Sequence, residues 1–523
     1  MSLRKYLLGS AAVIGALASV APARAQSSAQ LNAQIQALQD QVRALNQQLQ
    51  SLQTQVVQTQ RNQAVTSATV ADMKATPAPA GSSGIVVSMP NNRPTIATAD
   101  GQNSISLTGR IHWDVGDYAN YAPRTHNLSS PTPTDLNSGE NLRRARLGVV
   151  GKIAGDWNYG LIYDFGGSTD SGPSSSGITA NQSGGLETAE LSYNGFRPLT
   201  IEGGAEDVPY TLDEATSSND IMFIERSSSQ VIAANLAAGD FRENFGGHWN
   251  TDRLWLGAYF TGPTTGSTHA ITSGFAEQVG AVERATYQLL QSDQYSLHIG
   301  GDAEELLKPE TVGGARVVTT FSDRPELRID PTSFINTGTL GSATNPVTGA
   351  SVLGGELAGG FGSLFGQAEY FHYKVDRSGL SSAAFNGGYV EASYTLTGEH
   401  RKYNPATGAY GGIIPDRPFD IHHVMDGAWG ALELGARYSA IDLNSNYTSG
   451  QTTTASTAAV AGGKQQVITL GANWYINNNI RFMLDYLHGN ISKPLAATAG
   501  TIPLGTNVGA TFDAIALRTQ VAW

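Results

Sequence analysis

Hydrophobic and polar positions alternate along the last ten residues of the chain, AIALRTQVAW. One face carries Ile515, Leu517, Thr519, Val521 and Trp523, and the other carries Arg518 and Gln520. A period of two predicts a strand with one apolar face and one polar face. Such a strand fits the edge of a soluble sandwich or the lipid-facing wall of an outer-membrane barrel. The rest of the chain has to distinguish these alternatives.

The same alternation recurs from about residue 101 onward. Segments 105–115, 146–165 and 468–486 alternate, and short turns at 156–158 and 477–479 join strands into hairpins. Aromatic residues lie beside these turns, whereas other connections are long and polar, such as 171–185 and 446–464. Short turns on one rim, long loops on the other and aromatic residues at the interface are typical of an outer-membrane barrel. We therefore predict an all-β transmembrane barrel over residues 101–523.

The two ends of the chain support export to the outer membrane. Residues 1–25 have a positive start, an apolar run and an Ala-Arg-Ala cleavage site, which predicts a secretory signal peptide. No later stretch reaches the roughly 20 apolar residues of a spanning helix. Trp523 should close the last strand at the periplasmic interface, where the segment resembles the signal read by the barrel-assembly machinery.

A heptad pattern follows the signal peptide and predicts an α-helical coiled coil in the periplasm over residues 26–63. Its core positions are Leu31, Ile35, Leu38, Val42, Leu45, Leu49, Leu52 and Val56. β-Branched residues at a with Leu at d favour two strands, but Leu49 relaxes that preference, so two or three strands stay open. Residues 64–100 contain much Pro, Ala, Gly and Ser, which predicts a linker with at most one short strand.

Composition excludes several classes of protein. The chain has no cysteine, so neither disulfides nor thiolate metal sites hold it together. Charged residues make up 15% of the chain and the mean hydropathy is −0.20, as expected where only alternate strand residues meet lipid. Without the three basic residues of the signal peptide, 29 basic and 44 acidic residues leave a net charge of −15. Nucleic acid is therefore a poor candidate partner.

Four segments resemble the phosphate-selective porin O and P family. They are DEATSSNDIMFIERS (213–227), RRARLGVVGKIAGDWNYGLIYDFG (143–166), YTLTGEHRKYNP (394–405) and GAWGALELGARYSAIDLN (427–444). The resemblance implies about sixteen antiparallel strands around a watery lumen. It also implies a homotrimer and the passage of small anions such as phosphate through a constriction with basic side chains. No catalytic residue, cofactor or metal is expected.

Basic residues on the inward faces of the matched strands are candidate anion contacts. They are Arg110, Arg146, Lys152, Arg437, Arg481 and Arg518, and Arg226 joins them from a segment expected to fold inward. A guanidinium binds phosphate by a two-pronged contact and keeps its charge at any working pH. The alternative for each residue is an ordinary lumen arginine paired with a carboxylate. Inward carboxylates are available at Asp114, Asp164, Glu391, Glu433 and Asp485.

One position departs from the family's pattern. Family members usually carry Gly-x-x-Lys-x-Pro-aromatic where this chain has GAEDVPY, residues 204–210, so Asp207 replaces the expected Lys. A carboxylate in a narrow pore would repel anions. Asp207 is thus a candidate for altered selectivity, and a weakly selective general porin remains an alternative function.

Two alternative functions are an outer-membrane enzyme and a structural tether. An outer-membrane enzyme would use Asp420, His422, His423 and Asp426 in DIHHVMD as a metal site or an acid-base pair. Adjacent histidines on a strand point to opposite faces, however, so a polar loop is the favoured interpretation. A structural tether would use the coiled coil, whose roughly 26 residues reach about 40 Å at 1.5 Å per residue. Tethering is compatible with a channel as a second role.

Overall fold

The computed structural model describes residues 84–123, 136–166, 185–239, 241–265, 276–292, 294–312, 315–318, 320–448, 451, 453–454, 456–494 and 509–523. The predicted signal peptide, the predicted coiled coil and most of the predicted linker lie outside these residues and stay predictions. Within the described part, no helix is both long and apolar enough to cross a membrane.

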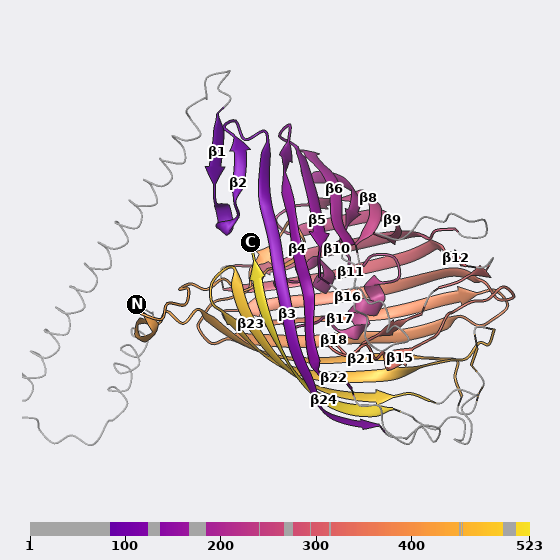
Figure 1. Cartoon of the computed structure of the whole chain (residues 1–523). Helices are drawn as coiled ribbons and strands as arrows, with labels where there is room; N and C mark the ends of the chain where they lie inside the picture. The colour runs from indigo at the N-terminus through magenta and orange to yellow at the C-terminus, as the bar shows by residue number, and fades with distance from the viewer. Residues whose placement is uncertain are drawn as a thin grey trace, which may run out of the picture. The chain divides into compact units, whose positions relative to one another are not determined.

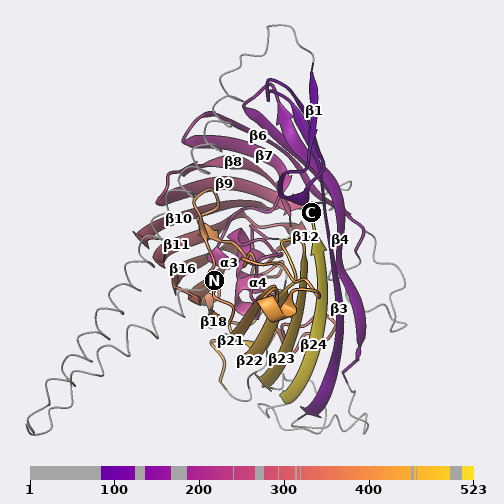
Figure 2. The same ribbon diagram turned by 90° about the vertical axis from the view of Figure 1, so that its left-hand side faces the viewer.

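Sixteen antiparallel strands pair in sequence order, and the last pairs with the first, so the sheet closes into a barrel (Figures 1 and 2). This confirms the predicted barrel. The strands are β3 (Ser104–Pro123), β4 (Gly139–Ile153), β5 (Trp157–Asp164), β6 (Gly185–Phe196), β7 (Leu199–Glu206), β8 (Arg242–Asn250), β9 (Leu254–Thr264), β10 (Val279–Gln291), β11 (Tyr295–Lys308), β16 (Val347–Phe361), β17 (Leu364–Arg377), β18 (Ala383–Thr395), β21 (Ala431–Ser445), β22 (Val460–Tyr475), β23 (Ile480–Ser492) and β24 (Ala510–Ala522).

Alternation along the strands separates an exposed apolar outer face from a buried inner face, which carries polar side chains and also apolar clusters such as Met483 and Leu487. In β3, Trp113 is 43% exposed, whereas its neighbours His112 and Asp114 are 0% and 1% exposed. In β24, Leu517 is 42% exposed and Arg518 is 0% exposed. Apolar side chains thus cover the outside of the barrel, where lipid would lie, and polar and apolar side chains share its inner face.

The C-terminal residue completes the closure of the barrel. The Trp523 amide donates to the Gly109 carbonyl at 3.0 Å, and the Gly109 amide donates to the Trp523 carbonyl at 3.1 Å. The indole lies over Gly109, where a β-carbon would collide with the ring. A ring packed on the wall explains why a large aromatic residue can occupy the chain end without fraying.

A β-hairpin precedes the barrel within the predicted linker. It comprises β1 (Ile85–Ser88) and β2 (Thr95–Thr98), so this segment has two strands where at most one was expected. The reason lies in β3, whose first residues extend beyond the end of β24. Its edge at 104–106 would be unpaired there, and β2 pairs with it, Thr95 opposite Ser106.

The two rims of the barrel differ in most of their connections. Short turns join strand pairs at one rim, as predicted, although the first lies at 154–156 rather than 156–158. Residues 396–430 are the exception at this rim, because they form a long segment with β19 (Tyr403–Asn404), β20 (Ala409–Tyr410) and η3 (Val424–Asp426). The other rim carries long connections except at 378–382. One of the long connections includes β12 (Thr311–Val312), β13 (Ala315–Arg316), β14 (Ser322–Asp323) and β15 (Ile335–Asn336).

One long connection folds into the barrel instead of outward. Residues 207–241 join β7 to β8 and contain two short helices, α3 (Leu212–Ala215) and α4 (Ser228–Ala234), which Figure 2 shows within the ring of strands. Each helix has an N-cap: Thr211 accepts from the Glu214 amide, and Ser227 accepts from the Gln230 amide. We call residues 207–239 the inward segment.

Candidate functional site

Side chains of the barrel wall hold the backbone of the inward segment. The donor and acceptor pairs are Arg518 Nη1 to Ile224 O (2.5 Å), Arg437 Nη1 to Glu225 O (2.8 Å), Arg481 Nη1 to Asn219 O (3.1 Å), Asn473 Nδ2 to Met222 O (2.9 Å) and Ile224 N to Asp485 Oδ2 (2.8 Å). These wall residues lie on β21 to β24. Their hydrogen bonds satisfy backbone groups that the inward segment would otherwise bury unpaired.

Three of the predicted anion contacts belong to this group. Arg518 pairs with Asp114 at 2.6 Å, and Arg437 pairs with Glu326 at 2.7 Å. Arg481 instead binds backbone carbonyls and lies over the Tyr475 ring, 4.7 Å from its centre. All three guanidiniums are therefore engaged in fixing the inward segment, and their role as anion contacts stays a prediction.

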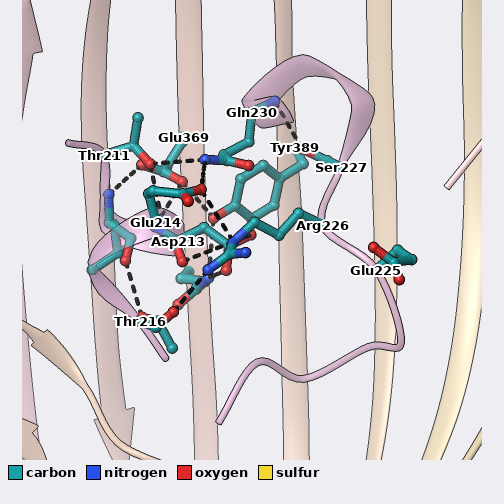
Figure 3. Close-up of polar contacts among 12 residues, drawn as sticks. Thr211, Asp213, Glu214, Thr216, Glu225, Arg226, Ser227, Gln230, Glu369 and Tyr389 are labelled. Carbon is teal, nitrogen blue, oxygen red and sulfur yellow. Dashed lines mark hydrogen bonds and ion pairs between the residues drawn. The ribbon is translucent and has the colours of Figure 1, made fainter. Parts of the chain in front are cut away.

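Glu225 is the main charged anchor of the inward segment. It accepts from Arg143 Nε at 2.7 Å and from Arg518 Nη2 at 2.9 Å. Burial alone would raise the pKa of Glu225, but the surrounding guanidiniums, Arg143 foremost, hold it well below its ordinary value. Glu225 is thus ionised at any pH at which the barrel would work. Figure 3 shows it pointing away from Arg226, its neighbour in the sequence.

Arg226 turns back onto its own segment. Its guanidinium donates to the carbonyls of Asp213 and Thr216 at 3.1 and 2.9 Å, and lies 3.4 Å from the Glu214 carboxylate (Figure 3). Burial would lower the pKa of Arg226, but Glu214 and Asp213 outweigh it and raise the pKa. Arg226 therefore links α3 to the residues that precede α4.

A β-bulge brings two consecutive arginines to the lumen. The register between β3 and β4 shifts between His112 and Trp113, which pair with Arg144 and Leu142, so Arg143 is the extra residue. Strict alternation would turn Arg143 toward lipid, but the bulge re-aims the side chain. Arg143 reaches Glu225, and Arg144 lies 3.4 Å from His112 Nδ1. Neither arginine was among the predicted site residues. A bulge leaves no mark in the sequence pattern, so Arg143 could not be found from it, whereas Arg144 shares the face of Arg146 two residues later and alternation could have found it.

A cavity of about 510 Å³ lies between the inward segment and β3 to β6. Six arginines and five carboxyl groups of the described residues line it. The arginines are Arg110, Arg143, Arg144, Arg146, Arg226 and Arg328, and the carboxyl groups belong to Asp164, Glu187, Asp207, Glu214 and Glu225. Three of the predicted candidates, Arg110, Arg146 and Arg226, thus share one cavity with Asp207.

Two arginines of the cavity lack a carboxylate partner. Arg146 pairs with Asp164 at 2.8 Å and with Glu187. Within the described residues, by contrast, Arg110 donates to the Ser218 hydroxyl at 2.6 Å, and Arg144 Nη1 lies 3.4 Å from His112 Nδ1, with no carboxylate in an ion pair with either guanidinium. The Nε of Arg144 has no hydrogen-bond partner there. Arg110 and Arg144 are therefore the cations of the cavity whose charge no paired carboxylate cancels.

Asp207 lies in the same cavity beside Glu214. Burial raises the pKa of Asp207 well above its ordinary value, and the negative charge of Glu214 raises it further. Burial would raise the pKa of Glu214 too, but Arg226 together with the hydrogen bonds from Asp207 and Gln230 outweighs burial and lowers it. The surroundings thus favour the protonated form of Asp207 and the ionised form of Glu214.

The remaining sequence candidates lie away from this cavity. Lys152 is on the inner face of β4 close to the turn at 154–156. Asp420, His423 and Asp426 lie in an exposed loop that includes η3, and His423 Nδ1 is 3.2 Å from Asp426. This agrees with the loop interpretation of DIHHVMD.

This chain is similar to several known proteins. The family model for phosphate-selective porin O and P matches residues 105–523. Porin O of Pseudomonas aeruginosa is 24% identical over 413 residues, 76% of this chain and 85% of that protein. An uncharacterized protein of Caulobacter vibrioides is 26% identical over 454 residues, 82% of this chain and 80% of that protein. Among solved structures, in-vitro folded OmpT, an outer membrane protein of Vibrio cholerae, is 11% identical with a TM-score of 0.45, over 81% of this chain and 98% of that one.

Proposed function

This chain belongs to the phosphate-selective porin O and P family and is an outer-membrane porin, and we propose that it conducts small anions such as phosphate past Arg110 and Arg144. The observation that carries the proposal is a buried cavity in which these two guanidiniums lack a carboxylate partner among the described residues. A buried charge without a partner is costly. An anion from solution supplies the missing partner.

The balance of charge in the cavity supports anions over cations. Six arginines face five carboxyl groups, so basic groups are in excess in the cavity. The raised pKa of Asp207 favours its uncharged form, which reduces its repulsion toward anions. The net charge of the whole chain is negative, but ions in a narrow lumen respond mainly to the charges closest to them because salt screens distant ones.

The hydrogen-bonding groups of the cavity suit phosphate. A guanidinium offers two parallel N–H donors to two phosphate oxygens. The lining also includes the hydroxyl groups of Ser217 and Ser218. These donors would replace the hydration water of the anion as it passes, which favours its entry into the pore. The anion is not trapped as long as several weak binding sites follow one another.

Assembly and the N-terminal part are further proposals. Family membership supports a homotrimer in the outer membrane. Residues 26–63 would form a coiled coil in the periplasm that clamps the subunits or tethers the envelope, and Trp523 would direct the chain to the barrel-assembly machinery. Chemical cross-linking of the full chain would report the number of subunits.

Ion selectivity tests the proposal directly. The purified protein is inserted into a planar bilayer that separates two KCl concentrations, and the reversal potential is measured. We expect its sign to show chloride as the main carrier, and added phosphate to reduce the chloride current by competition. A current carried by potassium would overturn the proposal and favour the weakly selective porin.

A further inference from the structure

Three buried carboxylates meet on the wall at β11, β16 and β17. They belong to Asp302, Glu356 and Glu369, and one oxygen from each lies within 4.8 Å of the others. Glu356 and Glu369 are directly opposite each other in the register of β16 and β17. Like charges in that position destabilise a sheet unless something compensates them.

The described neighbours compensate only part of this charge. Arg284 makes a two-pronged contact with Glu356, with Nε to Oε1 and Nη2 to Oε2 both at 3.1 Å. Glu369 accepts from the Leu212 amide at 2.6 Å and from the Tyr389 hydroxyl at 2.7 Å, neither of which carries charge. Both carboxylate oxygens of Asp302 lack a hydrogen-bond partner. When all three carboxyl groups are ionised, one guanidinium leaves two negative charges uncompensated.

The backbone of the wall is shaped to admit two of these carboxylates. A β-carbon on Gly300 would collide with the Glu356 carboxylate, and a β-carbon on Gly354 would collide with the Asp302 carboxylate. Gly300 is opposite Glu356 in the register, and Gly354 is opposite Asp302. Each acid therefore lies across a glycine on the neighbouring strand, so the two carboxylates lie close to the sheet and near each other.

Two more buried polar groups lie beside the cluster without a hydrogen bond among the described residues. His298 is 0% exposed, its Nε2 lies 3.4 Å from Glu356 Oε1, and neither ring nitrogen has a hydrogen bond in the described part. Tyr210, from the inward segment, is also 0% exposed and lies beside Asp302, and its hydroxyl has no hydrogen-bond partner among the described residues. Groups of this kind are usually satisfied in a folded protein.

We propose that Asp302, Glu356 and Glu369 bind one divalent cation of the calcium class, with His298 and Tyr210 completing its surroundings. A divalent ion would neutralise the two negative charges that Arg284 leaves. Calcium binds carboxylate oxygens at about 2.3–2.6 Å, so oxygens on opposite sides of the ion lie up to about 5 Å apart. Magnesium requires shorter bonds, regular octahedral geometry and several retained waters, which makes it the poorer fit.

The cation would connect the wall to the inward segment. Glu369 also accepts from the amides of Leu212 and Asp213, where α3 begins. An ion bound to Glu369 would therefore fix the carboxylate that holds α3. This site lies on the side of the barrel away from the arginines of β3 and β4, so the ion would stabilise the inward segment without entering the anion cavity.

Equilibrium dialysis with radioactive calcium tests the site. The full-length protein in detergent is stripped with EDTA and titrated with Ca²⁺ up to about 10 mM, which exceeds the weakest affinities of about 1 mM known for protein calcium sites. We expect one Ca²⁺ per subunit, with Mg²⁺ a weak competitor. Absence of Ca²⁺ binding to the wild-type protein would overturn the proposal, whatever the variants do.

Variants locate the binding. Asp302→Asn should weaken Ca²⁺ binding at least about tenfold, as loss of a group that holds a metal commonly does. Asp442→Asn is the control, because Asp442 pairs with Lys464 at 2.7 Å outside the cluster. Should D302N fail to fold, judged by its electrophoretic mobility with and without heating, Glu356→Gln takes its place. Unchanged Ca²⁺ binding in the folded variant would refute the site, while the reversal potential tests anion conduction independently.

Discussion

Replacing Arg144 with glutamine tests the anion pathway most sharply. Arg144 lies in the lumen cavity without a carboxylate partner among the described residues, and its charge is not needed to hold Glu225, which Arg143 and Arg518 contact. Glutamine keeps a hydrogen-bond donor near His112 and removes only the charge. We therefore expect the barrel to fold and its selectivity to change.

The size of the change follows from Coulomb's law. A unit charge about 4 Å from a passing monovalent ion contributes about 1 kcal/mol in water. Screening over a Debye length of about 10 Å at 0.1 M salt reduces this to about 0.7 kcal/mol. The sign is opposite for chloride and potassium, so the anion-to-cation permeability ratio should fall by about 1.4 kcal/mol, which is about tenfold.

The assay is the reversal potential in a KCl gradient, with a matched control. Arg253→Gln removes the same charge from an exposed turn between β8 and β9. Its effect should be small because the charge lies in solvent away from the cavity. A reversal potential of R144Q equal to that of the wild type would refute the reasoning, as would an equal shift in R253Q.

Three further predictions concern the inward segment and the N-terminal part. Anion selectivity should fall at alkaline pH as Asp207 loses its proton, because burial and Glu214 raise its pKa. Asp207→Asn should abolish this fall. If the reversal potentials of the wild type and D207N had identical pH profiles, the predicted titration of Asp207 would be contradicted. Glu225→Gln removes the buried carboxylate that Arg143 and Arg518 contact and should lower the free energy of unfolding by about 3–5 kcal/mol. The midpoint of unfolding in urea measures this against Glu243→Gln, an exposed control. Deletion of residues 26–73 should leave the conductance unchanged and reduce envelope integrity, measured as the detergent sensitivity of cells. Loss of conductance would show that the channel and the tether cannot be separated.

The wall of the barrel was predictable because lipid and water impose a strict rule on it. Trp113 and Leu517 had to face outward and Arg518 inward, since alternate side chains of each strand meet opposite environments. The hairpin at 85–98 was not predictable, because it depends on how far β3 extends beyond β24. The same holds for residues 396–430, which carry no alternating pattern.

The sequence predicted that arginines line the candidate site, but it did not predict which of them are paired with carboxylates. The sequence indicated that Arg110, Arg146 and Arg226 face the lumen, and the cavity brings them together. Which arginine is paired depends on partners far away in the sequence, such as Glu326 for Arg437, 111 residues apart. The raised pKa of Asp207 depends on its burial beside Glu214, which only the folded inward segment creates.

The carboxylate of Glu225 lies across the seam where the two ends of the barrel meet. It contacts Arg143 on β4 and Arg518 on β24, the second and the last strands of the ring. These two arginines come into reach of one carboxylate only after β24 has paired with β3. The inward segment therefore gains its full set of anchors only in a ring that has closed. A chain whose final strand has not paired would lack the contact between Glu225 and Arg518.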